Sequence, residues 1–172
     1  GVHVTIVYKR VMENINIDYA VRGEGEYVLK SLISYLNGDA NAFPKEGLVY
    51  RKGGKLIEQA QAFVQDLTKL PWSDYSLVNM HDYVNTGARN GPLRAPEYPS
   101  LRLVVTRGCP VGCSFCQVEF LSGKNVRTRD PEDIIEEILF LKQKYGIKSI
   151  IFEDDNISMP RKFFLRLLKL FI

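Results

Sequence analysis

The sequence of 172 residues contains few of the side chains that usually bind metals or form disulfides, with three cysteines and two histidines. The cysteines lie together between Cys109 and Cys116, whereas His3 and His81 are remote from them in sequence. A disulfide framework is disfavoured, because three clustered cysteines leave one thiol over. A structural zinc site usually needs four Cys or His ligands. It would therefore require folding to bring a histidine close.

The sequence also lacks a recognisable signal peptide, an apolar run long enough to cross a membrane, and a strong charge of either sign. Its net charge of +3 is too small to indicate a polyanionic partner. Lys124, Arg127 and Arg129 form a small basic run, which we interpret as a solvated loop. Reduced thiols are typical of the cytoplasm. We therefore expect a cytoplasmic protein with no membrane and no nucleic-acid partner.

The cysteines that are present form the pattern C-x3-C-x2-C, directly after the apolar run 101–105. Three thiolates on one short loop can converge on a single soft metal centre. A cubane cluster has four irons, so three protein ligands leave one iron open to a small molecule. We predict that Cys109, Cys113 and Cys116 bind such a cluster.

This segment closely resembles the cysteine loop of the radical S-adenosylmethionine (SAM) superfamily. In that family the cysteines hold a 4Fe–4S cluster whose open iron chelates the amino and carboxylate groups of SAM. One electron then cleaves SAM to methionine and a deoxyadenosyl radical, which abstracts hydrogen from a substrate. The resemblance also implies that Phe115, the aromatic before the third cysteine, lies against the adenine of SAM. The alternative is that Phe115 merely shields the cluster from water.

The rest of the segment 101–172 predicts alternating strands and helices. The run 101–105 is typical of a buried parallel strand, and 147–152 predicts a second one. Between them, Asp130 and Pro131 begin a helix that ends at Tyr145-Gly146. A strand, helix and strand in this order predict a right-handed unit with parallel pairing. A further helix is expected from near Pro160, and the resemblance implies the first units of a partial TIM-like barrel.

The acidic loop Glu153-Asp154-Asp155-Asn156 follows the second predicted strand. In a β/α barrel the active site lies at this end of the strands, so this loop and the cysteine loop share one face. The radical SAM superfamily often has Gly-Gly-Glu here, whereas its cobalamin-dependent members often show Asp-Asp, as this sequence does. We predict that Asp154 or Asp155 binds the ammonium of SAM. The alternative is a loop that caps the next helix.

The first 65 residues predict a strand at 15–21, a Gly-rich turn, a helix to about Asn37 and a hairpin at 47–57. The segments 1–5 and 17–26 resemble the C-terminal part of a Rossmann-like cobalamin-binding domain. That domain precedes many radical SAM domains. The resemblance implies cobalamin for the parent protein. Because the early strands and a D-x-H-x-x-G motif are missing, we expect this piece not to bind cobalamin tightly.

The expected fold is therefore α/β in three parts. Residues 1–65 are the end of the cobalamin-binding domain, 66–100 an inter-domain linker with some ordered turns, and 101–172 the truncated start of the barrel. The absence of an initial Met, and an ending inside an apolar helical pattern, predict a piece of a longer protein.

The expected function of the parent protein is radical generation from SAM, with methyl transfer to an unactivated carbon as the leading outcome. A small-molecule substrate and an external electron donor are expected partners, and no catalytic residue is assigned. One alternative is a tRNA methylthiotransferase, although its second set of upstream cysteines is absent. The other is a non-catalytic iron–sulfur or zinc module.

Overall fold

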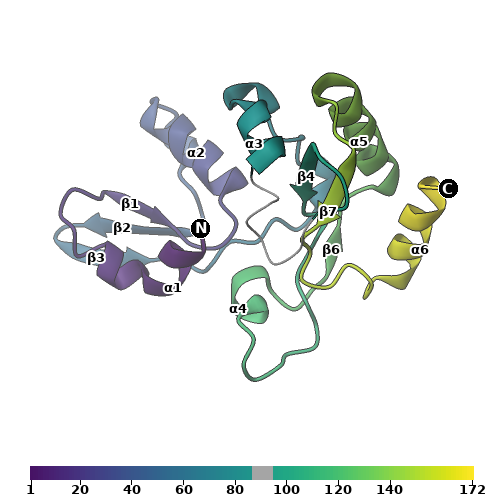
Figure 1. Ribbon diagram of the computed structural model, residues 1–172. Coiled ribbons are helices and arrows are strands. Elements are labelled where there is room, and N and C mark those ends of the chain that lie inside the picture. The colour runs from purple at the N-terminus through teal and green to yellow at the C-terminus, as the bar shows by residue number, and fades with distance from the viewer. Residues whose placement is uncertain (87–94) are drawn as a thin grey trace. The chain divides into compact units, whose positions relative to one another are not determined.

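The computed structural model describes residues 1–86 and 95–172 of this α/β chain (Figure 1). Four prolines, Pro71, Pro92, Pro96 and Pro99, favour a linker over residues 66–100, and Pro92 lies outside the described residues. The chain divides into two compact units. The first unit consists of residues 1–65 and 114–123, and the second consists of 66–113 and 124–172. The change at residue 65 coincides with one predicted boundary, but the domain limits themselves remain a prediction.

The first unit contains a small antiparallel sheet with helices. Its elements are α1 (Val2–Val11), β1 (Tyr19–Val21), α2 (Glu26–Leu36), the 3-10 turn η1 (Ala40–Ala42), β2 (Leu48–Lys52), β3 (Lys55–Glu58) and α4 (Val118–Ser122). The strand order is β1-β2-β3. The predicted hairpin is confirmed, because Gly53 and Gly54 both have positive φ, at 57° and 75°, as a tight turn of this kind requires. The predicted strand at 15–21 is shorter than expected and begins at Tyr19.

The Gly-rich turn before α2 is held by buried polar contacts. The Thr5 hydroxyl accepts a hydrogen bond from the Gly23 N–H at 2.9 Å, and the Glu24 carboxylate accepts one from the Val64 N–H at 2.7 Å. Gly23 has φ of +82°, and a Cβ there would lie 2.2 Å from the Ala62 carbonyl oxygen. The turn therefore has a structural role. His3 is an exposed residue of α1.

The spacing of the apolar residues of α2 predicts that Tyr27, Val28, Leu32, Ile33 and Leu36 form one buried stripe, but the structure buries a narrower one. Val28 and Leu32 are buried against the sheet. Tyr27, Ile33 and Leu36, which were expected on the same stripe, are 43%, 50% and 58% exposed. The three-stranded sheet covers only part of the apolar arc of α2.

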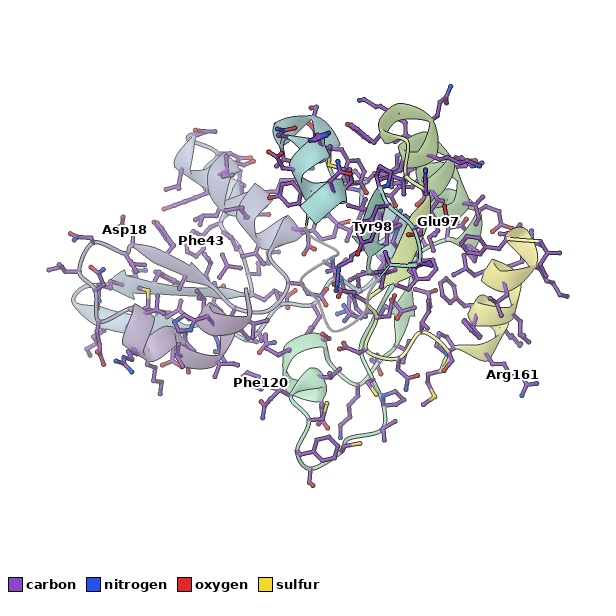
Figure 2. The ribbon with its side chains drawn as sticks, in the orientation of Figure 1. Asp18, Phe43, Glu97, Tyr98, Phe120 and Arg161 are labelled. Carbon is purple, nitrogen blue, oxygen red and sulfur yellow. The ribbon has the colours of Figure 1, made fainter. Side chains whose placement is uncertain are left out.

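The second unit contains the parallel strand pair. Its elements are the 3-10 turns η2 (Leu67–Lys69) and η3 (Tyr75–Leu77), α3 (Met80–Thr86), β4 (Ser100–Leu103), β5 (Thr106–Arg107), β6 (Arg127–Thr128), α5 (Pro131–Tyr145), β7 (Ser149–Phe152) and α6 (Arg161–Leu170). The predicted parallel pairing is confirmed, with Leu101 opposite Ile150 and Leu103 opposite Phe152. The short antiparallel pair β5–β6 was not predicted. The solvated loop expected for the basic run is wrong at Arg127, which is a buried residue of β6, and at Arg129, which pairs with Glu137. In Figure 2, Glu97 and Tyr98 lie beside the β4–β7 pair, where the Glu97 carbonyl accepts from the Ser149 hydroxyl at 2.6 Å.

The helix α5 begins and ends where its sequence predicted. The Asp130 carboxylate accepts hydrogen bonds from the N–H groups of Glu132 and Asp133, and Gly146 ends the helix with φ of 67°. The apolar spacing of α5 predicts a buried stripe that includes Leu139, but this residue is 57% exposed. The core under α5 contains the following buried residues from β4, from the segments just before β5 and β7, and from the helices: Leu103, Val105, Ile134, Leu141, Ile147 and Leu167.

The segment predicted as a linker packs into the second unit over its described part. Trp72 Nε1 donates to the Asp133 carboxylate at 2.8 Å, and the Tyr75 hydroxyl donates to Glu137 at 2.5 Å. Met80 and Val84 of α3 are buried in the same core as β4. The aromatic residues Trp72, Tyr75 and Tyr83 predict that this segment attaches to a neighbouring surface, and Trp72 and Tyr75 do attach it to α5. Tyr83 does not share this role, since it is 58% exposed.

Within the two described ranges, no helix has the length and apolar character needed to cross a membrane.

Candidate metal and cofactor site

The three predicted cysteine ligands lie on the loop between β5 and α4. Cys109 is half-buried, Cys113 and Cys116 are exposed, and all three are free thiols. Over the described residues, no three His, Cys, Asp or Glu side chains are arranged to hold a metal ion. The three thiols lie on one loop, with Cys109 and Cys113 in the second unit and Cys116 in the first. As a donor set, three thiols on a short loop suit an iron–sulfur cluster.

The acidic loop after β7 is hydrogen-bonded to the backbone that leads into the cysteine loop. One carboxylate oxygen of Asp154, Oδ1, accepts hydrogen bonds from the N–H groups of Val105, at 2.9 Å, and of Thr106. The Glu153 N–H continues the hydrogen bonding between β4 and β7 by donating to the Leu103 carbonyl at 2.9 Å. These contacts bear out the expectation that the acidic loop and the cysteine loop share one end of the parallel strands.

The acids of this loop differ in their surroundings. The Glu153 carboxylate forms an ion pair with Arg102. The second oxygen of Asp154, Oδ2, is buried and has no hydrogen-bond partner among the described residues. Burial raises the pKa of Asp154, while the two backbone N–H donors work against this rise. Burial also raises the pKa of Asp155, which is an exposed residue overall.

A carboxylate whose buried oxygen has no hydrogen-bond partner can bind a cation. An ammonium group beside Asp154 would satisfy Oδ2 and favour the charged form of the acid. Of the two aspartates that the sequence predicted, Asp154 therefore has the surroundings better suited to a ligand. A SAM contact by either one remains a prediction.

Sequence reasoning missed the role of Asn156, the last residue of the acidic loop. Its amide nitrogen Nδ2 lies 3.9 Å from Sγ of Cys109. Only the position of Asn156 in the sequence could have indicated this contact, because it follows the second strand at the edge of the sheet where the cysteine loop begins.

Phe115 is 86% exposed. Its predicted place against the adenine of SAM, or as a shield for a cluster, therefore remains a prediction.

Comparison with known protein families gives the class of this second half of the chain. The family model of the Radical SAM superfamily matches residues 103–171. The matched region contains the cysteine loop, α5, β7 and most of α6. This part of the chain belongs to the radical SAM superfamily, as the cysteine pattern predicted.

Individual relatives extend the similarity over nearly the whole chain. The chain is 33% identical over 164 residues to an uncharacterized methyltransferase of Pyrococcus horikoshii, covering 94% of this chain and 34% of the relative. The chain therefore spans about a third of the length of this relative.

Solved structures show the same fold. A radical S-adenosylmethionine methyltransferase, TsrM from Kitasatospora setae, matches with a TM-score of 0.67 and 18% identity, over 99% of this chain and 32% of that one. The cobalamin-dependent S-adenosylmethionine radical enzyme OxsB matches with a TM-score of 0.63 and 19% identity, over 90% of this chain and 20% of that one.

Proposed function

We propose that this chain is part of a radical SAM enzyme in which Cys109, Cys113 and Cys116 hold a 4Fe–4S cluster that binds SAM at its open iron. The observation that carries the proposal is the position of the cysteine loop. It follows the carboxyl end of β4, a strand paired in parallel with β7, inside the segment that matches the superfamily. When bound, the reduced cluster supplies the electron that cleaves SAM into methionine and a deoxyadenosyl radical.

The residues of the chain would hold and orient SAM. Asp154, whose Oδ1 accepts two backbone hydrogen bonds and whose Oδ2 is buried without a partner among the described residues, would accept a hydrogen bond from the amino group of SAM at Oδ2. Phe115, one residue before the third cysteine, would cover the adenine. In these roles the protein transfers no proton. It binds and orients SAM and keeps water away from the reacting atoms.

For the whole protein we propose cobalamin-dependent methyl transfer to a small-molecule substrate. The support is the similarity to a methyltransferase of Pyrococcus horikoshii and the fold shared with TsrM and OxsB, whose structures were solved with tryptophan and with aqua-cobalamin respectively. Residues 1–65 would be the end of the cobalamin-binding domain, 66–100 the connection and 101–172 the start of the barrel. An external donor would supply the electron, and thiol ligands suit the cytoplasm.

The proposal is tested by anaerobic reconstitution of the chain with iron and sulfide, followed by electron paramagnetic resonance of the reduced sample with and without SAM. We expect a cubane signal whose shape changes when SAM is added, because SAM occupies the open iron. A cluster signal indifferent to SAM would contradict SAM binding by this chain. Stoichiometric zinc without any cluster, in protein purified without oxygen, would overturn the proposal.

Matched variants locate the cluster on the loop. Replacing any one of Cys109, Cys113 and Cys116 by Ser should abolish the SAM-sensitive signal. Ser114→Ala changes a residue of the same loop that carries no thiol, and it should keep the signal.

A further inference from the structure

The amide of Asn156 and the sulfur of Cys109 form a contact between the two loops at the carboxyl ends of β4 and β7. Nδ2 of Asn156 lies 3.9 Å from Sγ of Cys109 and is oriented to donate to it. We propose that Asn156 is a positioning residue that donates to the cluster-bound thiolate and raises the reduction potential of the cluster. This inference rests on the proposed function, since it requires a cluster on Cys109.

The contact is held by the framework around it. Asp154 fastens the acidic loop to the N–H groups of Val105 and Thr106, three residues before Cys109. Asn156 lies two residues further along and is half-buried, and its carbonyl accepts from the Met159 N–H at 3.3 Å. The backbone on both sides is therefore fixed close to where the amide meets the sulfur.

The orientation of the amide follows from its neighbours. The Ser158 hydroxyl donates to Oδ1 of Asn156 at 3.4 Å, which directs the oxygen to serine and the nitrogen to sulfur. The opposite orientation would place a carbonyl oxygen against a thiolate, two acceptors in contact. The charge of a bound thiolate thus favours the orientation seen here.

A donor at this position acts on the reduction equilibrium of the cluster. Reduction adds negative charge, and a hydrogen bond to a ligand sulfur stabilises the more negative state more strongly, which raises the potential. Cys109 is the least exposed of the three cysteines, and electrostatic contacts are stronger where water is partly excluded. Asn156 would therefore make it easier for an external donor to reduce the cluster.

The test is a redox titration of the reconstituted chain, followed by the resonance signal of the reduced cluster. Asn156→Leu keeps the approximate size of the side chain and removes the donor. We expect the equilibrium constant for reduction to fall about tenfold, which corresponds to a midpoint about 59 mV lower for a one-electron couple. Asn125→Leu alters an exposed asparagine of the loop before β6 and should leave the midpoint unchanged.

The outcomes separate this inference from the proposed function. A wild-type chain that assembles no cluster contradicts the proposed function. Clusters of equal iron and sulfide content with equal midpoints in wild type and Asn156→Leu overturn the role of Asn156 and leave the proposed function standing. Asn156→Ala is a second variant in case leucine disturbs the loop. If neither variant assembles a cluster while the Asn125 control does, Asn156 serves assembly of the loop, and the proposed effect on potential is wrong.

Discussion

At the scale of single residues, the two carboxylate oxygens of Asp154 have different surroundings. Its Oδ1 accepts from two backbone N–H groups, whereas Oδ2 is buried without a partner among the described residues. The first feature stabilises the fold, because each net hydrogen bond contributes about 1 kcal/mol. The second makes the charged form costly, and burial accordingly raises the pKa of the carboxyl group.

We predict opposite consequences for two substitutions of Asp154. Asp154→Ala loses both hydrogen bonds and should lower the free energy of unfolding by about 1–3 kcal/mol. Asp154→Asn keeps an acceptor for the backbone and removes the buried charge, so its stability near neutral pH should equal or exceed that of wild type. The asparagine variant should nevertheless lose the effect of SAM on the cluster signal, because an amide NH2 in place of Oδ2 cannot accept a hydrogen bond from the amino group of SAM.

The pH dependence gives a second measurement of the same residue. The pKa of Asp154 is higher in the folded state than in the unfolded state, so the folded state binds more protons between the two values. Its contribution to stability is therefore fully present below the unfolded pKa of about 3.9 and is lost as pH rises through the folded pKa. Urea unfolding of wild type and Asp154→Asn at several pH values should show this loss in wild type alone. Identical pH profiles would contradict the assignment.

At the scale of secondary-structure elements, a buried charged network fastens the segment around η3 to α5. Arg129 Nη1 lies 2.6 Å from a carboxylate oxygen of Glu137, whose other oxygen accepts from the Tyr75 hydroxyl at 2.5 Å. The Glu137 side chain is 2% exposed. Burial, followed by the hydrogen bond to Glu137, raises the pKa of Tyr75 well above its usual range, so this tyrosine remains a neutral donor.

We predict that Glu137→Gln destabilises the second unit by about 3–5 kcal/mol, because it leaves the half-buried Arg129 without one of its charged partners. Tyr75→Phe removes one hydrogen bond and should cost about 1–2 kcal/mol. The fluorescence of Trp72, the single tryptophan, reports this unit, since its ring lies 5.7 Å from that of Phe140.

The neighbour Glu136 provides the matched control. It is exposed on the same helix, and Glu136→Gln should change the free energy of unfolding by less than about 0.5 kcal/mol. Equal effects of the two glutamine variants would mean that the network contributes no stability beyond ordinary surface charge.

The same elements show which parts of the fold a sequence can predict. The helix α5 was predictable because Asp130, Pro131 and Gly146 are local signals at its ends. The pair β5–β6 was not, since two-residue strands carry no periodicity. The surface that the segment around Trp72 packs against was not predictable either, because its attachment depends on partners such as Asp133, 61 residues further along the chain. Contacts of that range leave no local pattern.

The candidate site likewise has some features that the sequence predicts and others that it does not. Three cysteines in a fixed spacing reveal a ligand set by themselves, so Cys109, Cys113 and Cys116 could be named from the sequence. The acidic loop could be placed at the same end of the strands because parallel pairing was predictable. What distinguishes Asp154 from Asp155, and brings Asn156 to Cys109, is the local path of the loop after β7. That path depends on which backbone N–H groups the loop meets.

At the scale of the whole molecule, the chain forms two units, each with its own core, and its cysteine loop contributes residues to both. The chain spans about a third of its Pyrococcus horikoshii relative. The described residues nevertheless contain complete elements of the proposed SAM site: the ligand loop, the strand ends and the acidic loop. Cluster binding should therefore be measurable on this chain as a change in stability, independently of turnover.

We predict that cluster assembly raises the thermal unfolding midpoint of the chain. Ligands that bind the folded state alone stabilise it by mass action, and a hundredfold excess over Kd is worth about 2.7 kcal/mol. For a chain of this size, that corresponds to a rise of roughly 5–10 °C. The rise should vanish in Cys109→Ser, Cys113→Ser and Cys116→Ser and persist in Ser114→Ala. SAM should add a further rise in the loaded protein and none in the cluster-free protein. Calorimetry under anaerobic conditions measures all of these samples. If loaded and cluster-free proteins unfold at the same temperature, the iron is bound without coupling to the fold, and the three cysteines do not act as one site.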